Sequence, residues 1–282
     1  MIERLAIVGL GLLGGSVAKA VRAEGLAREI VAVGRSREGL DLALTEGAVD
    51  RVTTDLADGL RGADLCLLAT PVTTLVELLP AVWHRAAPDA VITDVGSTKA
   101  ALAAAAEGLH AARPLAFVGS HPMAGSEQSG YRASRPDLFR GALVIITPTG
   151  ATPPDAQKRV TGLWESLGAR VTAMDPETHD RAAAAISHLP HLVADALVDA
   201  VLRMDPAFLA LAARGFRDTT RIAAANPEVW REIFAENRVA LGEALGAFRG
   251  ALDDLERLVA AGDPAAVEAE LARIRRARES LG

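Results

Sequence analysis

The chain has 282 residues, of which 50% are hydrophobic and 23% charged, and its formal net charge is -6 at pH 7. This length exceeds what one small core needs, so two domains are expected. Lysine and arginine are scattered through an acidic chain, which argues against a nucleic-acid surface, and the single cysteine, Cys66, excludes an internal disulfide. No uninterrupted apolar stretch of membrane-spanning length and no signal peptide are evident, so we expect a cytoplasmic protein that makes no use of a membrane.

A glycine-rich segment follows the first apolar run. Residues 5–8 predict a buried strand, and residues 17–24 predict a helix. Between them, Gly9 suits a tight turn, Gly11 lets the backbone approach a pyrophosphate, and Gly14 allows the helix to pack closely on the strand. The free N–H groups at the start of such a helix face the phosphates. We therefore predict a dinucleotide site that includes Gly9, Gly11, Leu12, Leu13 and Gly14.

The end of the second predicted strand, residues 30–33, bears on the choice of cofactor. Enzymes that prefer NAD usually carry an acidic residue there for the ribose 2′-hydroxyl, whereas this chain continues with Gly34, Arg35 and Ser36. Arg35 and Ser36 favour NADP, because a guanidinium and a hydroxyl can hold a 2′-phosphate. The alternative is that both residues are simply solvated on a loop, and NAD then remains possible.

Further buried strands are predicted at residues 65–68, 90–93, 115–118, 143–146 and 169–172, mostly separated by helical stretches. This alternation favours a mostly parallel α/β sheet, in which ligands bind beyond the carboxyl ends of the strands. Polar clusters follow three of these strands, at residues 69–72 (with Thr70 and Pro71), 94–99 and 119–122. The three clusters are expected to converge on one crevice.

The character of the chain changes after Met174. The remainder reads as successive helices rich in Ala, Leu, Arg and Glu, with no convincing strand. We predict a dinucleotide-binding domain over residues 1–174 and an all-helical substrate and dimerisation domain over residues 175–282.

The segment 121–130 places an imidazole at a strand exit beside a glycine-rich loop. Oxidising an alcohol requires a base for the hydroxyl proton as the hydride departs, and neutral imidazole is a suitable base near neutral pH. His121 is therefore the candidate base, with Ser97 on the neighbouring polar cluster as a second candidate. Capping of strand ends is the alternative for both.

Five motifs occur in an order that resembles prephenate and arogenate dehydrogenases. They are residues 9–16, 94–99, 120–127, 187–191 and 216–221, and together they span nearly the whole chain. The resemblance implies a Rossmann-type N-terminal domain, an intertwined helical domain that forms a homodimer, and no metal. It also implies oxidative decarboxylation of prephenate or arogenate, with hydride transfer to NAD(P)⁺. Prephenate and arogenate differ only at the side chain, and no residue that distinguishes them is identified.

The resemblance also assigns roles to side chains. His121 is the base at the 4-hydroxyl of the substrate, and Ser97 forms a hydrogen bond in the same region of the substrate. Arg221 suits a carboxylate clamp because a guanidinium can grip a carboxylate through two hydrogen bonds, and Asp218, three residues earlier, is a candidate to orient it. The other implied substrate-side residues are His191, Ser126, Glu127 as a gate, and Trp230 contributed by the partner subunit, whereas His188 is expected to be structural.

Two other functions are compatible with parts of the pattern. A 3-hydroxyacid or 6-phosphogluconate type of dehydrogenase would use a lysine for proton transfer, and Lys99 is the residue available. A non-catalytic NADP-binding regulator would use the fold alone. Neither needs the combination of His121, His191 and Arg221.

Overall fold

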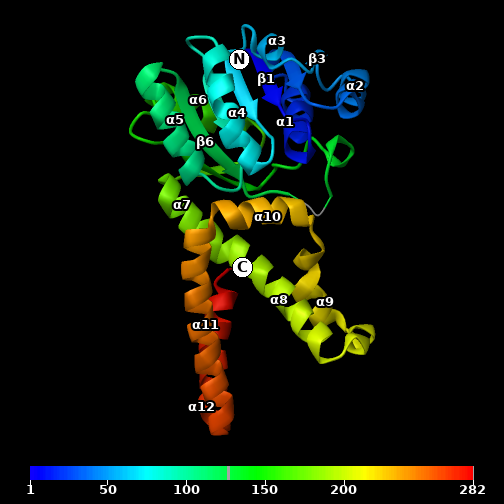
Figure 1. Cartoon of the computed structure of the whole chain (residues 1–282), viewed down its shortest axis with the longest axis vertical. Helices are drawn as coiled ribbons and strands as arrows, with labels where there is room; N and C mark the ends of the chain where they lie inside the picture. Colours follow the sequence, from blue (N-terminus) through cyan, green and yellow to red (C-terminus); the bar gives the residue numbers. More distant parts are fainter. Residues whose placement is uncertain (126–127, 282) are drawn as a thin grey trace.

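The computed structural model describes residues 1–125 and 128–281, and it consists of an α/β half followed by an all-helical half (Figure 1). The α/β half contains, in chain order, β1 (Ile2–Val8), α1 (Leu12–Ala23), β2 (Ala27–Val33), α2 (Arg37–Thr45), β3 (Arg51–Thr53), α3 (Leu56–Leu60), β4 (Leu65–Leu68), α4 (Val72–Arg85), β5 (Val91–Asp94), α5 (Ala100–Ala112), β6 (Ala116–Pro122), the short helix η1 (Tyr131–Ala133), β7 (Leu143–Thr147), α6 (Pro154–Ser166) and β8 (Arg170–Ala173). The helical half contains α7 (Pro176–Ala183), the π-helical turn η2 (Ala184–His188), α8 (Leu189–Met204), η3 (Pro206–Leu211), α9 (Arg214–Thr220), η4 (Arg221–Ala224), α10 (Pro227–Glu236), α11 (Arg238–Ala261) and α12 (Pro264–Glu279).

The strands form one eight-stranded sheet in the order β3-β2-β1-β4-β5-β6-β7-β8. All neighbours are parallel except β6 and β7, which confirms the mostly parallel sheet. The first six strands have the order of a dinucleotide-binding fold, in which the strand order reverses between β1 and β4. Such a switch point leaves a crevice at the carboxyl ends of these two strands.

Alternating side chains on the strands build a core on each face of the sheet. On β1, Leu5 and Ile7 join the core covered by α1, α2 and α6, whereas Ala6 and Val8 join the core covered by α3, α4 and α5. Cys66 is fully buried in the second core, as expected. The strand predicted at residues 169–172 forms as β8, but most of its residues are exposed because β8 is the edge of the sheet; β3 was not predicted.

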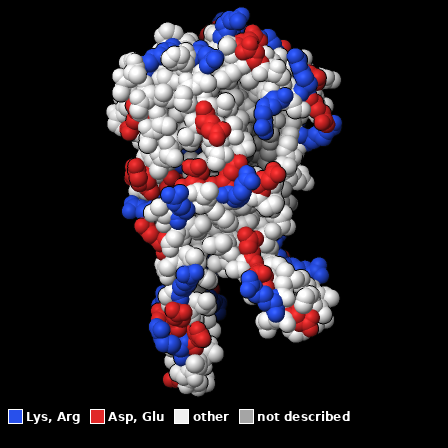
Figure 2. All heavy atoms as spheres, in the orientation of Figure 1, with Lys and Arg blue, Asp and Glu red and all other residues white. Residues whose placement is uncertain are grey.

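The helical half extends away from the sheet as two projections, one carrying α8 and α9 and the other carrying α11 and α12 (Figures 1 and 2). Large apolar side chains are exposed on both, including Leu202, Met204, Val239 and Val259. On the face drawn in Figure 2, lysine and arginine are mixed with acidic side chains, and acidic groups form a band where the two halves meet.

The π-helical turn joins α7 to α8, so that Pro176–Met204 is a single helix of 29 residues. Its length and composition would allow it to cross a membrane, and 17% of its most apolar window is buried inside the structure. The sequence predicted no uninterrupted apolar stretch of this length, and the helix, although long enough, contains ionisable residues. Asp180 and Asp195 interrupt its apolar sequence, and one such helix is weak evidence for a membrane protein.

Candidate active site

A cleft of about 640 Å³ lies at the carboxyl ends of β1, β2 and β4, at the switch point of the sheet. Six of the predicted cofactor residues line it: Gly9, Gly11, Arg35, Ser36, Thr70 and Pro71. The other three, Leu12, Leu13 and Gly14, lie in the first turn of α1, directly behind the glycine turn. The cleft lies at the position expected of a dinucleotide, but of the three polar clusters expected to converge, only the first lines it, through residues 69–71.

The three glycines of the motif differ in their surroundings. Gly9 has a φ of 98°, and a Cβ there would lie 2.6 Å from the carbonyl oxygen of Ala69. A Cβ on Gly14 would lie 2.1 Å from the carbonyl oxygen of Gly9, so only glycine allows the helix to pack this closely on the turn. A Cβ on Gly11 would meet nothing within 4 Å. Gly11 therefore leaves open space at the N-terminus of α1, where a pyrophosphate fits.

The far end of the cleft carries the groups that would meet the adenosine ribose. Arg35 is exposed and makes no ion pair with any described residue, and the hydroxyl of Ser36 makes no capping bond to α2. Glu38 also lines the cleft, 3.8 Å from Arg132 on η1. Nearer the middle of the sheet, the buried Thr70 Oγ1 has no hydrogen-bond partner within the described parts of the chain. Arg35, Ser36 and Thr70 are therefore available to a ligand.

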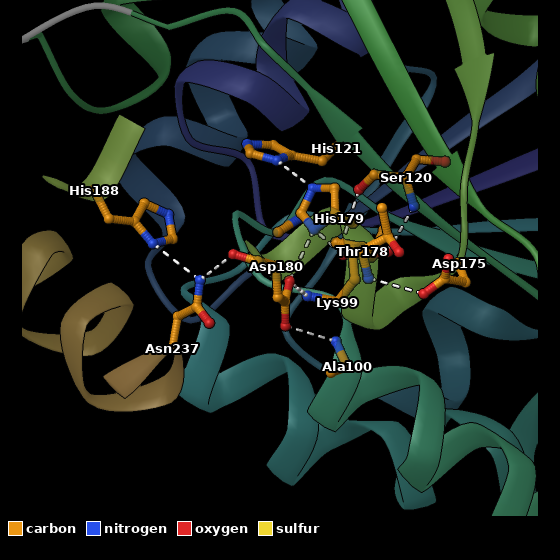
Figure 3. A network of polar contacts seen from close by, with 12 residues as sticks. Lys99, Ala100, Ser120, His121, Asp175, Thr178, His179, Asp180, His188 and Asn237 are labelled. Atoms are coloured by element: carbon orange, nitrogen blue, oxygen red, sulfur yellow. Dashed lines mark hydrogen bonds and ion pairs between the residues drawn. The ribbon is translucent and has the colours of Figure 1, made fainter. Parts of the chain in front are cut away.

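His121 lies near the end of β6 and begins a chain of hydrogen bonds into the helical half (Figure 3). Its Nδ1 lies 2.9 Å from His179 Nε2, and His179 Nδ1 lies 2.8 Å from Asp180 Oδ1. Because a carboxylate only accepts, His179 donates from Nδ1 and accepts at Nε2, so His121 donates from Nδ1. This leaves His121 Nε2 unprotonated, and Figure 3 shows that nitrogen directed away from His179. The arrangement fixes the tautomer that a general base requires.

The surroundings of His121 keep its imidazole neutral. Burial lowers the pKa of His121 well below 6.5, and the nearby His179, Lys99 and His188 act in the same direction. A group with such a pKa is unprotonated throughout the neutral range and can accept a proton as soon as a substrate hydroxyl reaches it.

Asp180 joins the helical half to the sheet half. Its two carboxylate oxygens accept the backbone N–H groups of Lys99 (2.8 Å) and Ala100 (2.9 Å) at the start of α5. Burial alone would raise the pKa of Asp180, but the hydrogen bonds from His179 and from the Ala100 and Lys99 backbone outweigh it and leave the pKa below the usual value. One carboxylate therefore caps a helix and holds the end of the histidine pair.

Sequence reasoning did not identify His179 and Asp180, although a signal existed. The buried residues of α7 are Pro176, His179, Asp180 and Ala183, which recur with helical spacing. Two ionisable side chains in the buried stripe of a helix must be paired, because an unpaired buried charge is costly. That pattern points to a polar network at the junction.

We expect Asp180→Asn to lower the free energy of unfolding at pH 7 by about 2 kcal/mol or more, because an amide leaves at least one buried donor unsatisfied. The pKa of Asp180 is lowered on folding, so its carboxylate stabilises the protein above the unfolded pKa and loses that effect as pH falls through the folded pKa. The difference between wild type and variant should therefore shrink on acidification. Denaturant unfolding at several pH values tests this.

Asp263→Asn provides the matched control, because Asp263 caps α12 from an exposed position. Its loss should cost about 1 kcal/mol or less. Equal losses in the two variants would contradict a special role for Asp180 at the junction.

The structure locates the other predicted catalytic groups in the same region. Ser97 is half-buried on the loop between β5 and α5, and no hydrogen bond joins it to His121. Lys99 is 1% exposed, forms an ion pair with Asp94, and donates to the carbonyl oxygen of Ser120 at 2.9 Å. The Lys99 ammonium is therefore buried and already engaged, which disfavours the lysine-dependent alternative.

His191 and Trp230 lie together beside the histidine chain. Their rings are stacked, with centroids 3.5 Å apart and planes 16° apart. α10 places Trp230 against His191 of the same chain, and the contribution of Trp230 from a partner subunit stays a prediction. His191 Nδ1 is buried and has no partner within the described residues, so it is available to a ligand. His188 bonds Asn237 at 3.1 Å, in agreement with a structural role.

Arg221 and Asp218 do not form the expected pair. Asp218 accepts from Arg214 at 3.1 Å, one turn earlier on α9, so the prediction that Asp218 orients Arg221 is wrong. Arg221 begins η4, is exposed, and makes no hydrogen bond or ion pair with any described residue. The predicted substrate residues Ser126 and Glu127 lie outside the described residues.

Two family models match the chain. Residues 17–173 match "Prephenate dehydrogenase, nucleotide-binding domain", and residues 175–273 match "Prephenate dehydrogenase, dimerization domain". A prephenate dehydrogenase of Bacillus subtilis is 36% identical over 84% of this chain, and the chain covers 65% of that protein's length.

Solved structures agree with this assignment. A prephenate dehydrogenase from Aquifex aeolicus, in complex with hydroxyphenyl propionate and NAD⁺, is 34% identical with a TM-score of 0.93, covering 100% of this chain and 99% of that one. The arogenate dehydrogenase of Synechocystis is 31% identical with a TM-score of 0.86, covering 99% and 100%. A 3-hydroxyisobutyrate dehydrogenase from Salmonella typhimurium, 13% identical with a TM-score of 0.62 over 88% of each chain, shares the fold alone. The chain therefore belongs to the prephenate dehydrogenase family of NAD(P)-dependent oxidoreductases.

Proposed function

We propose that this enzyme oxidatively decarboxylates prephenate or arogenate, with His121 as the base at the substrate 4-hydroxyl. The observation that carries the proposal is the hydrogen-bonded chain from His121 through His179 to Asp180, which leaves one imidazole nitrogen free to accept a proton. The named functions of the relatives, prephenate and arogenate dehydrogenases, support the substrate class.

The placement of His121 suits a dinucleotide in the cleft. The glycine turn follows β1, and His121 lies on β6, three strand positions along the sheet, or about 14 Å away. A dinucleotide bound by its pyrophosphate at the turn can reach this distance with its other end. The nicotinamide supplies the hydride acceptor when it is bound.

His121, His179 and Asp180 have separate roles in the proposed reaction. His121 Nε2 accepts the hydroxyl proton while the C4–H bond gives up its hydride, so a carbonyl replaces the alcohol. The bond between the ring and its carboxylate then breaks and carbon dioxide leaves. The electron pair of that bond completes the aromatic ring and turns the carbonyl into a phenolate, which takes back a proton. His179 and Asp180 hold the imidazole in the accepting tautomer and stabilise the positive charge that it gains.

The remaining substrate contacts are assigned to side chains of suitable chemistry, chosen for polar groups that the described residues leave without a partner. Arg221 grips a substrate carboxylate, and the unpartnered His191 Nδ1 bonds the substrate or the nicotinamide, with Trp230 fixing the ring plane of His191. Ser97 forms a hydrogen bond near the 4-hydroxyl, and the substrate roles of Ser126 and Glu127 stay predictions from the sequence. These roles are proposals for each residue.

For the cofactor we propose a preference for NADP. The support is the pair Arg35 and Ser36, which lines the cleft with unused polar groups, and the absence of an acidic residue directly after β2. A guanidinium and a hydroxyl can hold a 2′-phosphate in place of the ribose hydroxyl pair.

Arg35→Ala should raise the Michaelis constant for NADP by about tenfold or more while changing that for NAD by less than about twofold, because only NADP presents a phosphate to the guanidinium. Arg37→Ala, an exposed arginine that lies outside the lining of the cleft, is the control. Initial rates with both cofactors give the comparison. A wild-type enzyme that uses NAD as efficiently as NADP would contradict the preference.

We also propose a cytoplasmic homodimer formed through the helical half. The two helical projections expose large apolar side chains that a monomer would leave in water, such as Leu202, Met204 and Val259. The match to a dimerisation domain supports a second copy as their cover. The same contact would explain the exposed apolar side of Pro176–Met204 without a membrane.

Initial rates with prephenate and arogenate, each with NAD⁺ and NADP⁺, test the function directly. We expect reduced cofactor and carbon dioxide in equal amounts with at least one of the two substrates. A 3-hydroxyacid serves as the comparison substrate for the lysine-dependent alternative. Turnover of that acid alone would overturn the proposal, and binding of NADP without any turnover would favour a regulator.

A further inference from the structure

One buried ion pair lies directly behind the proposed base and has no role in the reaction as described so far. Lys99 and Asp94 are 1% and 0% exposed, and the Lys99 Nζ contacts Asp94 Oδ2. Placing two charges in the interior is costly, and a buried pair is weak evidence for stability alone. The surroundings of this pair indicate what it does.

The pair holds both backbone polar groups of Ser120, the residue immediately before His121. Asp94 Oδ1 accepts the backbone N–H of Ser120 at 3.0 Å, and Lys99 Nζ donates to the Ser120 carbonyl oxygen at 2.9 Å. The Ser120 hydroxyl lies 2.8 Å from Thr93 Oγ1. The pairing of β5 with β6 ends at Thr93 opposite Val118, so these side chains take the place of the sheet ladder at the point where β6 approaches the site.

Two glycines leave the space that the pair occupies. A Cβ on Gly96 would lie 2.9 Å from Asp94 Oδ2 and 3.4 Å from Lys99 Nζ. A Cβ on Gly119 would lie 3.3 Å from Lys99 Cδ and 2.3 Å from Thr147 Oγ1. The backbone on both sides is therefore shaped around the lysine stem and its carboxylate partner.

We propose that Asp94 and Lys99 act together as positioning residues for His121, by fixing both backbone polar groups of Ser120 at the end of β6. The inference rests on the proposed role of His121 as the base. Lys99 reaches the imidazole only through Ser120 and through its charge, and it exchanges no proton with the substrate.

The positive charge of Lys99 has a second effect, because it helps to keep the His121 imidazole neutral. The groups that face His121 are His179 from α7, His188 from η2 and Lys99 before α5, with Asp180 behind His179 and Asp94 behind Lys99. Burial is the largest cause of the low pKa of His121, and the Lys99 cation lowers it further. Removing the ammonium should therefore let His121 bind a proton at higher pH.

Lys99→Met tests the inference, since methionine keeps most of the volume without the charge or the donor. We expect kcat to fall about 10- to 100-fold, because small displacements of a catalytic group have effects of this size, while the Michaelis constant for the substrate changes little. The acid limb of the pH–rate profile should move to higher pH by about 1 unit. Lys158→Met, an exposed lysine on α6, is the matched control and should behave as wild type.

A second variant covers the case in which Lys99→Met leaves Asp94 as an unpaired buried charge and prevents folding. Asp94→Asn/Lys99→Met removes both charges, so it should fold and still show the lower kcat and the shifted titration. A folded Lys99→Met or double variant with the kcat and pH profile of Lys158→Met would overturn the inference.

Titration of the histidine ring signals by NMR, with His121→Asn to assign the resonance, needs no substrate. In wild type the His121 signal should stay in its neutral form as pH falls, and in both lysine variants it should titrate at higher pH. An unchanged His121 titration in the variants would count against Lys99 even if the enzyme proved active. A shifted titration without turnover of prephenate or arogenate would count against the proposed function and leave the positioning role intact.

Discussion

His121→Asn should lower kcat by about 10²- to 10⁴-fold, the usual contribution of a general base, while cofactor binding is retained. An asparagine amide can still donate to His179 Nε2 and preserve the polar chain, but it cannot accept a proton from the substrate hydroxyl. The effect should therefore fall on turnover more than on the Michaelis constant. Steady-state kinetics, together with a cofactor titration followed by fluorescence, separate the two quantities.

His84→Asn is the matched control, because His84 is an exposed histidine near the end of α4 and lies outside the site. Its kinetics should equal those of wild type. The residual rate of His121→Asn should lose the acid limb that protonation of the base would impose. Near-normal turnover of a folded His121→Asn across the pH range would remove His121 as the base and return it to a strand-end role.

The cofactor end of the site was largely predictable from the sequence because it depends on local backbone chemistry. The turn at Gly9, the close packing at Gly14 and the open space at Gly11 each follow from having no Cβ at a position fixed by the strand before and the helix after. The mostly parallel sheet was predictable for a similar reason, since the spacing of hydrophobic residues distinguishes each strand and helix locally.

The histidine chain was not predicted, because it depends on how two halves of the chain meet. His121 and His179 are 58 positions apart, and nothing in either local segment specifies the other. The only local sign is the presence of His179 and Asp180 in the buried stripe of α7, which indicates a polar partner without naming it.

The burial of Lys99 and the partner of Asp218 could not be predicted for the same physical reason. Lys99 precedes a helix, and the buried space that Asp94, Gly96 and Gly119 leave for its side chain exists only in the folded chain. Asp218 lies one turn from both Arg214 and Arg221 in the sequence. The helix α9 ends at Thr220, so only Arg214 has the i, i+4 spacing within one regular helix.

Arg221→Ala should raise the Michaelis constant for the substrate well over tenfold, with a smaller fall in kcat. Breaking one side of a desolvated charge pair costs on the order of 2 to 5 kcal/mol, and the carboxylate of the substrate would lose its only proposed guanidinium. The structure leaves Arg221 uncommitted, because it is exposed and pairs with no described residue. It begins η4, which packs against α8, the helix that carries His191.

Arg221→Lys should restore little of the affinity, because an ammonium cannot reproduce a two-point grip on a carboxylate. Arg203→Ala is the control: Arg203 is an exposed arginine on α8 that bonds Asp199 within its own helix, and its loss should leave substrate saturation unchanged. If Arg221→Ala saturates as wild type does, Arg221 is a surface residue. The ring carboxylate, whose departure drives aromatisation in the proposed reaction, would then need a different partner, and the substrate class itself would have to be tested again.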